Sequence, residues 1–302
     1  MANAADARPK SLSSARPALM MALAILVLSS MDALIKSFGT SLPILQIVWL
    51  RYAFGAVITV GVLLVTGPHQ ITGKSLKSNV VRSVFMVLTA LFFFYALTRM
   101  PLVETVTLAF TAPIFMILVA RLLLGEAITS RALFAVLLGF GGVLVVVAGD
   151  FGSGNALNTL GIAGALSAAV TYATWAVLLR KHASHDSIPV LTFLQTTLAA
   201  TILAPTGLIF WSGLSQMQVL TFVAVALLGT FGHMMLAWSL KHAEAARLAP
   251  IEYTNLVWAS LFGLVFFAER PAPMTLAGAV LIIAACLITA NPSKPLWPRR
   301  RA

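Results

Sequence analysis

The chain has 302 residues, of which 60% are hydrophobic and only 10% are charged, and its mean hydropathy is +0.96. A soluble domain carries charge on about a quarter of its residues, so this composition excludes a soluble globular protein and predicts that lipid surrounds most of the chain. The formal net charge of +11 does not indicate nucleic-acid binding, because the basic residues lie between apolar runs and at the chain ends and form no continuous patch.

The polar, mildly basic start of the chain is followed by an apolar run from Ala18. A signal peptide also has this order, but the run continues to about Phe38 without a convincing cleavage site, so we expect a retained first helix. The single cysteine, Cys286, lies within an apolar run. It predicts neither an internal disulfide nor a zinc or thiol site.

Ten apolar runs of roughly 20 residues follow one another, each long enough to cross a bilayer as a helix. The alternating pattern of a membrane β-barrel is absent. The predicted fold class is therefore an all-α integral membrane protein with ten transmembrane helices, and the loops are short except at 67–78 and 150–158. The predicted helices are 18–38, 43–66, 79–98, 102–124, 131–149, 159–180, 189–212, 217–241, 247–267 and 273–291.

The basic residues indicate how these helices are oriented. With the N-terminus inside, sixteen of the 20 Lys and Arg residues fall on the inner side, and Lys36, Arg99 and Arg270 fall on the outer side. Arg51 lies within the second helix. The positive-inside rule therefore predicts a multi-pass protein of the cell inner membrane with both termini in the cytoplasm.

An internal repeat relates the two halves of the chain. Residues 97–126 align without a gap on residues 240–269, and this pairs Glu104 with Arg247. Because each half has five helices, the halves must cross the membrane in opposite directions, which is a 5+5 inverted-topology repeat. The predicted organisation is a cytoplasmic tail, two five-helix repeats and a basic cytoplasmic tail, at 1–17, 18–149, 159–291 and 292–302.

Three stretches carry a family resemblance: MDALIKSF with WLRYAFG, FYALTRMPLVETVTLAFTAPIFMILVARLLLGE, and WSLKHAEAARLAPIEYTNLVWASLFGLVFFAER. The chain resembles the drug/metabolite transporter superfamily and, within it, the EamA-type ten-helix transporters. The resemblance implies a central cavity lined mainly by helices 1, 3, 4, 6, 8 and 9, and alternating access by rocking of the two halves. It does not indicate the substrate.

Charged residues inside the first two helices are candidates for function. Asp32 lies about six residues from the outer end of its helix, which at 1.5 Å per residue is roughly 9 Å below the surface. Arg51 is expected at a similar depth on the adjacent helix, and Lys36 lies one turn from Asp32. Asp32 is thus either a proton or cationic-substrate site, or one partner in a structural ion pair with Arg51 or Lys36.

Further polar and aromatic residues predict a binding surface and its gates. Glu104 and Arg247 are gate candidates or interfacial anchors, and Glu269 is expected to be a cap or an anchor. Proton-coupling candidates are Asp32, His233 and Glu252, although His233 could instead be a structural histidine bonded between helices. The substrate-binding candidates combine hydroxyl, amide, carboxylate and aromatic groups: Asp32, Tyr95, Thr107, Thr111, Tyr172, Trp175, Trp238, Glu252, Tyr253 and Asn255.

Proline and glycine predict local features of the helices. Pro113 lies in the middle of the fourth helix and predicts a kink there. Gly139, Gly141 and Gly142 in the fifth helix, with Gly278 in the tenth, predict a close helix contact or a dimer surface.

These patterns favour a secondary active transporter that moves a small amphipathic metabolite by alternating access. An amino-acid-like substrate with export is favoured, and the alternative is an importer of an aromatic vitamin-like cofactor of the riboflavin type or of a nucleoside-like compound. A channel or lipid flippase is a different class. No enzyme is expected, because no nucleophile–base set or metal-binding motif is present, so there are no catalytic residues, metal or cofactor. The expected partners are the substrate and membrane lipid, with the protein a monomer or homodimer.

Overall fold

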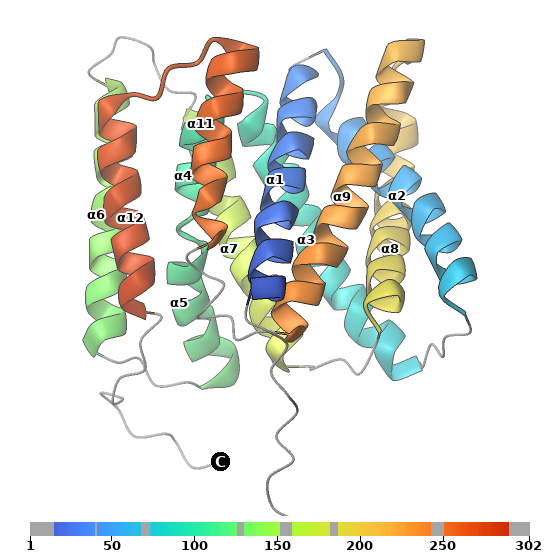
Figure 1. Cartoon of the computed structure of the whole chain (residues 1–302), viewed down its shortest axis with the longest axis horizontal. Helices are drawn as coiled ribbons and strands as arrows, with labels where there is room; N and C mark the ends of the chain where they lie inside the picture. Colours follow the sequence, from blue (N-terminus) through green and yellow to red (C-terminus); the bar gives the residue numbers. More distant parts are fainter. Residues whose placement is uncertain are drawn as a thin grey trace, which may run out of the picture.

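The computed structural model describes residues 15–39, 41–67, 73–125, 130–151, 159–181, 187–242 and 251–289. Within these ranges all regular structure is helical, and the helices stand side by side as a bundle (Figure 1). The helices are α1 (Ala15–Ser37), α2 (Ile44–Thr66), α3 (Gly73–Leu97), α4 (Leu102–Ala109), α5 (Ala112–Leu124), α6 (Ser130–Phe151), α7 (Thr159–Lys181), α8 (Ile188–Ile209), α9 (Gln216–His242), α11 (Thr254–Phe267) and α12 (Pro273–Thr289).

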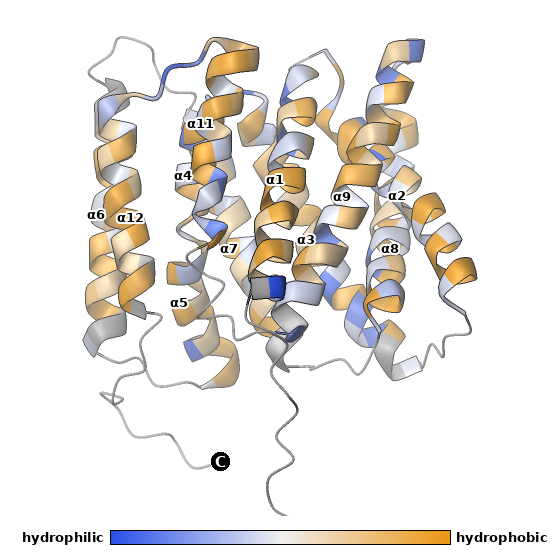
Figure 2. Cartoon of the chain, viewed as in Figure 1, coloured by the Kyte–Doolittle hydropathy of each residue, from blue (hydrophilic) through white to orange (hydrophobic). Residues whose placement is uncertain are grey.

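The outer surface of the bundle is apolar. Leu64, Val65 and Leu122 expose more than three quarters of their side-chain area, and hydrophobic residues run along the helices in Figure 2. Within the described residues, seven helical segments are long and apolar enough to cross a membrane, and three shorter apolar helices lie where three further spans are predicted. The prediction of an all-α, multi-pass membrane protein is therefore confirmed.

The helices of one half pack against helices of the other half. α1 begins at Ala15 and α7 at Thr159, and nearly the same interval separates the start of α3 at Gly73 from the start of α9 at Gln216. α1 packs on α9, α3 on α7, α2 on α8 and α6 on α12, so each of these contacts joins the two halves (Figure 1). A side chain placed between such a pair therefore responds to any movement of one half against the other.

Both halves have a turn at equivalent positions of the predicted repeat. Phe110 and Thr111 form a turn between α4 and α5, and Tyr253 forms a turn just before α11. In the first half Pro113 has no N–H to donate to the carbonyl of Ala109, which explains the break that the sequence predicts as a kink. Phe110 and Tyr253 occupy equivalent positions of the predicted repeat, and their rings meet edge to face at 5.4 Å.

Glycine permits the close packing of α6 on α12. A Cβ atom added to Gly142 would lie 2.9 Å from the carbonyl oxygen of Gly278, and one added to Gly278 would lie 2.7 Å from that of Gly142. The two backbones therefore meet with no room for a side chain between them. The predicted close contact at these two residues is confirmed, whereas an added Cβ at Gly141 would meet nothing within 4 Å.

Candidate functional site

A pocket lies among four helices that come from both halves of the chain. Its empty volume is about 370 Å³, and this figure includes space that is open to the surroundings. α2 and α3 contribute residues from the first half, and α8 and α9 contribute residues from the second half. The lining residues are Arg51, Tyr52, Met86, Thr192, Gln195, Thr196, Ala226, Gly229, Thr230 and His233. We call this the Arg51 pocket.

Arg51 provides the positive charge of the pocket. It is only 8% exposed and follows the first residue of α2 by seven positions, which is roughly 10 Å along the helix. Its guanidinium carbon lies 4.5 Å from the centre of the Tyr52 ring and 5.7 Å from that of Phe94. Its Nε donates to Met31 Sδ at 3.4 Å. The side chain thus rests between aromatic faces and a thioether at membrane depth.

Gly229 makes room for the guanidinium on the facing helix. A Cβ atom at this position would lie 3.3 Å from both Nε and Nη2 of Arg51 and 2.8 Å from Met31 Sδ. The cation of the first half therefore rests directly on the α9 backbone of the second half.

Asp32 does not form the ion pairs that the sequence suggests. Among the described residues, no salt bridge joins Asp32 to Arg51 or to Lys36, although Arg51 lies within electrostatic range of the Asp32 carboxylate. Asp32 is 7% exposed. Lys36 pairs instead with Glu269, because it lies one turn nearer the end of α1 and its long side chain reaches a different loop.

Uncharged polar groups complete the pocket. The amide nitrogen Nε2 of Gln195 is buried and has no hydrogen-bond partner among the described residues. Thr196 shares a hydrogen bond of 3.1 Å with Thr59 across the α2–α8 contact. His233 is exposed toward the pocket, and its Nδ1 lies 2.7 Å from the carbonyl oxygen of Gly229 on its own helix. The pocket therefore offers a cation together with neutral donors and acceptors.

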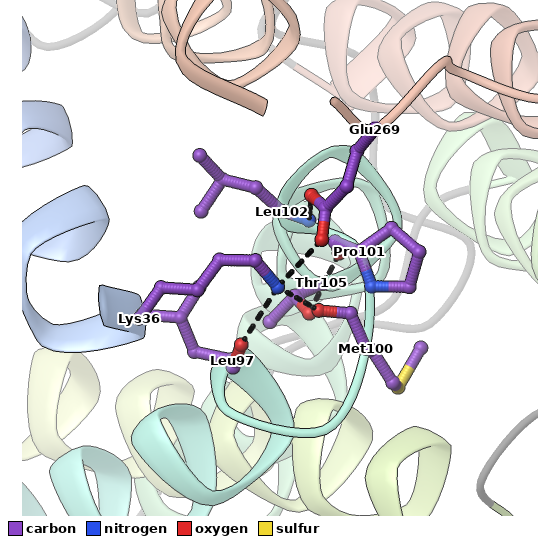
Figure 3. Close-up of polar contacts among 7 residues, drawn as sticks. All are labelled: Lys36, Leu97, Met100, Pro101, Leu102, Thr105 and Glu269. Atoms are coloured by element: carbon purple, nitrogen blue, oxygen red, sulfur yellow. Dashed lines mark hydrogen bonds and ion pairs between the residues drawn. The ribbon is translucent and has the colours of Figure 1, made fainter. Parts of the chain in front are cut away.

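At the edge of the bundle where α1 ends, a polar network joins the two halves (Figure 3). Lys36 Nζ lies 2.9 Å from Glu269 Oε1 and donates to the carbonyl oxygens of Leu97 and Met100. Glu269 Oε2 accepts a hydrogen bond of 2.8 Å from the backbone N–H of Leu102, the first residue of α4. A carboxylate is favourable at a helix N-terminus, so Glu269 caps a helix of the opposite half.

The same edge carries a second set of contacts between the halves. Gln46 is fully buried, donates to the carbonyl oxygen of Ser212 at 2.8 Å and accepts from the backbone and side chain of that residue. Phe38 stacks on Phe222 with 4.5 Å between ring centres. These contacts and the Lys36–Glu269 network together close this edge, which we call the closed edge.

Several predicted binding residues lie together around α7 and the start of α11. The rings of Tyr172 and Trp175 are 5.5 Å apart on α7, and Glu252 lies within electrostatic range of Tyr172. The side chain of Asn255 accepts a hydrogen bond of 2.6 Å from Ser29 on α1. The four predicted residues all belong to the second half and touch the first half through Ser29, and none of them lines the Arg51 pocket.

The other predicted site residues are dispersed. Tyr95 stacks under Arg99 at 4.3 Å, and Trp238 stacks on His242 at 4.2 Å. Thr111 donates to the carbonyl oxygen of Leu108. Glu104 and Thr107 are buried in α4, and the second gate candidate, Arg247, lies outside the described residues.

The polar part of α8 is not among the predicted site residues. Thr192, Gln195 and Thr196 lie within a segment for which the sequence predicts only a membrane helix. Their spacing of three and four residues places them on one helical face, and such a polar face within an apolar run is the signal that could have identified them. The Lys36–Glu269 pair had no local signal, because its members are far apart in the sequence.

A bundle of helices with an apolar outer surface and a buried cation at membrane depth defines an integral membrane protein. The chain matches the EamA-like transporter family twice, over residues 15–148 and 159–291. It therefore belongs to that family. It is a multi-pass membrane protein that transports small metabolites and is not an enzyme.

Named relatives are similar over most of their length. The pseudopaline exporter CntI of Pseudomonas aeruginosa strain UCBPP-PA14 is 28% identical over 91% of this chain and 96% of its own. The S-adenosylmethionine uptake transporter of Rickettsia felis is 24% identical over 92% of this chain and 93% of its own. The riboflavin transporter of Brucella anthropi is 29% identical over 82% of this chain and 88% of its own. The relatives thus differ in both substrate and direction.

A solved crystal structure of a protein has a similar fold. It superimposes with a TM-score of 0.63 at 20% sequence identity and covers 91% of this chain and 96% of its own. At this identity the likeness concerns the fold alone.

Proposed function

We propose that the protein is a secondary active transporter that moves a small, amphipathic, amino-acid-like metabolite across the inner membrane by alternating access, with export favoured. The observation that carries this proposal is the Arg51 pocket, which places a buried cation and neutral polar groups at membrane depth between helices of both halves. A polar pocket at the interface of two repeats is the usual binding site of secondary transporters.

The proposed architecture is a 5+5 inverted-topology repeat of ten transmembrane helices with both termini in the cytoplasm. Its support is the near-constant offset between corresponding helices of the two halves, the double match to one family and the excess of Lys and Arg on one side. In this orientation the closed edge faces away from the cytoplasm.

Alternating access requires the closed edge to open. The contacts that join the halves there, Lys36 with Glu269 and Gln46 with Ser212, would separate in the opposite state. Both sets are polar, so water can replace the lost partners when the edge opens. We assign them the gate role that was predicted for Glu104 and Arg247, which remain additional gate candidates.

Asp32, His233 and Glu252 remain the candidates for proton coupling. Asp32 is the strongest of these, because it is a buried acid without a salt-bridge partner among the described residues and lies within electrostatic range of Arg51. A change of its charge would alter the field in the pocket directly.

A second candidate function is import of an aromatic, vitamin-like cofactor of the riboflavin type or of a nucleoside-like compound. The adjacent, tilted rings of Tyr172 and Trp175 favour it, since aromatic faces bind planar rings. Relatives also include transporters named for riboflavin and S-adenosylmethionine. A channel or lipid flippase has no comparable support.

Counterflow in proteoliposomes tests the proposal. The purified protein is reconstituted, the vesicles are loaded with unlabelled amino acids or riboflavin, and entry of the labelled compound is followed. A carrier gives saturable exchange that exceeds equilibration. Linear flux without exchange would contradict the carrier mechanism, and exchange of riboflavin but no amino acid would favour the second candidate.

A further inference from the structure

The charge of Arg51 is incompletely compensated by the protein. A charge at the centre of a membrane helix is unfavourable unless the protein or a ligand compensates it. The rings of Tyr52 and Phe94 stabilise the cation through their faces. Ring faces accept no in-plane hydrogen bond, however, so they leave the N–H groups of the guanidinium without acceptors.

Within the described residues, the hydrogen bond from Nε to the weak acceptor Met31 Sδ is the only one that the Arg51 side chain makes. No carboxylate of that part of the chain lies within salt-bridge distance of it. Because a guanidinium has five N–H donors in a planar fork, the two terminal nitrogens are left for a partner that the chain does not supply. Carboxylates match this fork with two parallel hydrogen bonds.

The remaining lining of the pocket fits the same ligand group. Gln195 Nε2 has no acceptor among the described residues. Thr230 is buried against α2, the helix that carries Arg51: its Oγ1 would lie 3.3 Å from a Cβ atom added to Gly55. These groups donate hydrogen bonds and carry no negative charge. Asp32, within electrostatic range but not in contact, would attract the ammonium group of a zwitterion and so add to the affinity that Arg51 gives for the carboxylate alone.

We propose that Arg51 binds the carboxylate of a zwitterionic substrate, with Gln195 as a second donor. This inference rests on the proposed function, since it takes the Arg51 pocket as the transport site. It makes Arg51 a substrate-binding residue instead of a partner in a structural ion pair. It also makes the free carboxylate, more than the substrate's side chain, the feature that the protein requires.

The first experiment compares matched ligands on the full-length protein in detergent. Thermal unfolding is measured with leucine, histidine and tryptophan and with leucinamide, histidinamide and tryptophanamide, which lack only the carboxylate charge. At least one amino acid is expected to raise the Tm while its amide does not. Arg51→Gln is expected to weaken that binding at least about tenfold, as is usual when one partner of a buried charge pair is removed.

Two further variants separate charge, geometry and folding. Arg51→Lys keeps the positive charge but loses the planar fork, and it should also weaken carboxylate binding. Arg16→Gln removes an exposed arginine at the start of α1 and should bind as the unmodified protein does. Size-exclusion profiles show whether each variant is folded. Equal binding of acid and amide, or unchanged binding by folded Arg51→Gln, would overturn the inference.

A second measurement does not depend on the choice of amino acid. Phenylglyoxal, which modifies arginine, is applied to the native protein, and the Arg51 peptide is quantified by mass spectrometry with acetate or acetamide present. Acetate should protect Arg51 and acetamide should not. If Arg51 does not react, or reacts equally in acetate and in acetamide, the inference is contradicted even if counterflow shows that the protein is a transporter. Acetate protection without any counterflow would instead contradict the proposed function.

Discussion

At the scale of single residues, the environment of a charge decides what it does. Lys36 and Arg51 are both cations of the first two helices, yet Lys36 has a carboxylate and two carbonyl oxygens as partners, whereas Arg51 has aromatic rings and a thioether. Lys36 therefore stabilises the conformation in which it contacts these oxygen atoms. A cation with free donors remains available to a ligand.

The Lys36–Glu269 pair should stabilise the closed edge measurably. Each of Lys36→Gln and Glu269→Gln is expected to lower the Tm in detergent, and the double variant should lose less than the sum, with a coupling of about 0.5–3 kcal/mol. Removal of one partner leaves the other charge largely buried without its counter-charge, which is why the single variants lose most stability. Strictly additive losses in this double-mutant cycle would show that the pair contributes nothing.

Asp32→Asn tests the role of the unpaired acid in coupling. If Asp32 carries the proton, this variant should lose uphill transport driven by a pH gradient while it retains exchange of substrate at equal pH, because an amide cannot release a proton. Transport in proteoliposomes with and without the gradient measures this. Should uptake and its pH dependence both survive, the proton is carried elsewhere, and His233 and Glu252 are the next candidates.

At the scale of elements, the contacts between helices depend on where the backbones can approach. α6 and α12 meet at Gly142 and Gly278. A Cβ atom added to either glycine would lie less than 3 Å from the carbonyl oxygen of the other. The α4–α5 break and the break before α11 place Phe110 and Tyr253 against each other. Proline explains the first break. Leu256 stands at the position equivalent to Pro113, so proline does not explain the second.

A single added methyl group should disturb the α6–α12 contact. Gly142→Ala is expected to lower stability by about 1–3 kcal/mol, the usual cost of overpacking, because its Cβ would lie 2.8 Å from Ile282 and 2.9 Å from the Gly278 carbonyl. Gly141→Ala is the matched control, since its Cβ meets nothing within 4 Å. Thermal melts of both variants decide the point, and equal melting temperatures would contradict it.

At the scale of the whole molecule, the two edges of the bundle differ. Lys36, the loop before α4 and the loop after α11 meet at the closed edge, which agrees with the prediction that Lys36, Arg99 and Arg270 share one side. In Figure 1, α1 begins and α12 ends at the opposite edge. The proposed orientation places that opposite edge in the cytoplasm.

Cysteine labelling of intact cells tests this orientation. With Cys286 replaced by serine, a cysteine at Ser37, which is exposed at the closed edge, should react with a membrane-impermeant maleimide from outside. A cysteine at Thr66, exposed at the other end of α2, should react only after the cells are lysed. The reverse pattern would invert the topology and with it the direction assigned to the closed edge.

Properties that depend on residue type and on spacing along one helix could be predicted from the sequence. Apolar runs of about 20 residues identify membrane helices. In lipid the backbone N–H and C=O groups have no water to bond, so they must form hydrogen bonds with one another, as they do in a helix. The gapless alignment of the two halves indicates a repeat, and Pro113 predicts the interruption between α4 and α5. The family motifs lie in these same segments, so the class of protein could be predicted without a structure.

Which polar groups meet is visible only in the folded chain. Asp32 could have paired with Arg51 or with Lys36, and the structure instead pairs Lys36 with Glu269, a residue in the other half of the chain. It also brings Gln195 and Thr196 of α8 beside Arg51 of α2. Side-chain partners across helices depend on the rotation, tilt and depth of each helix, and these are set by packing against neighbours, which no local pattern in the sequence records.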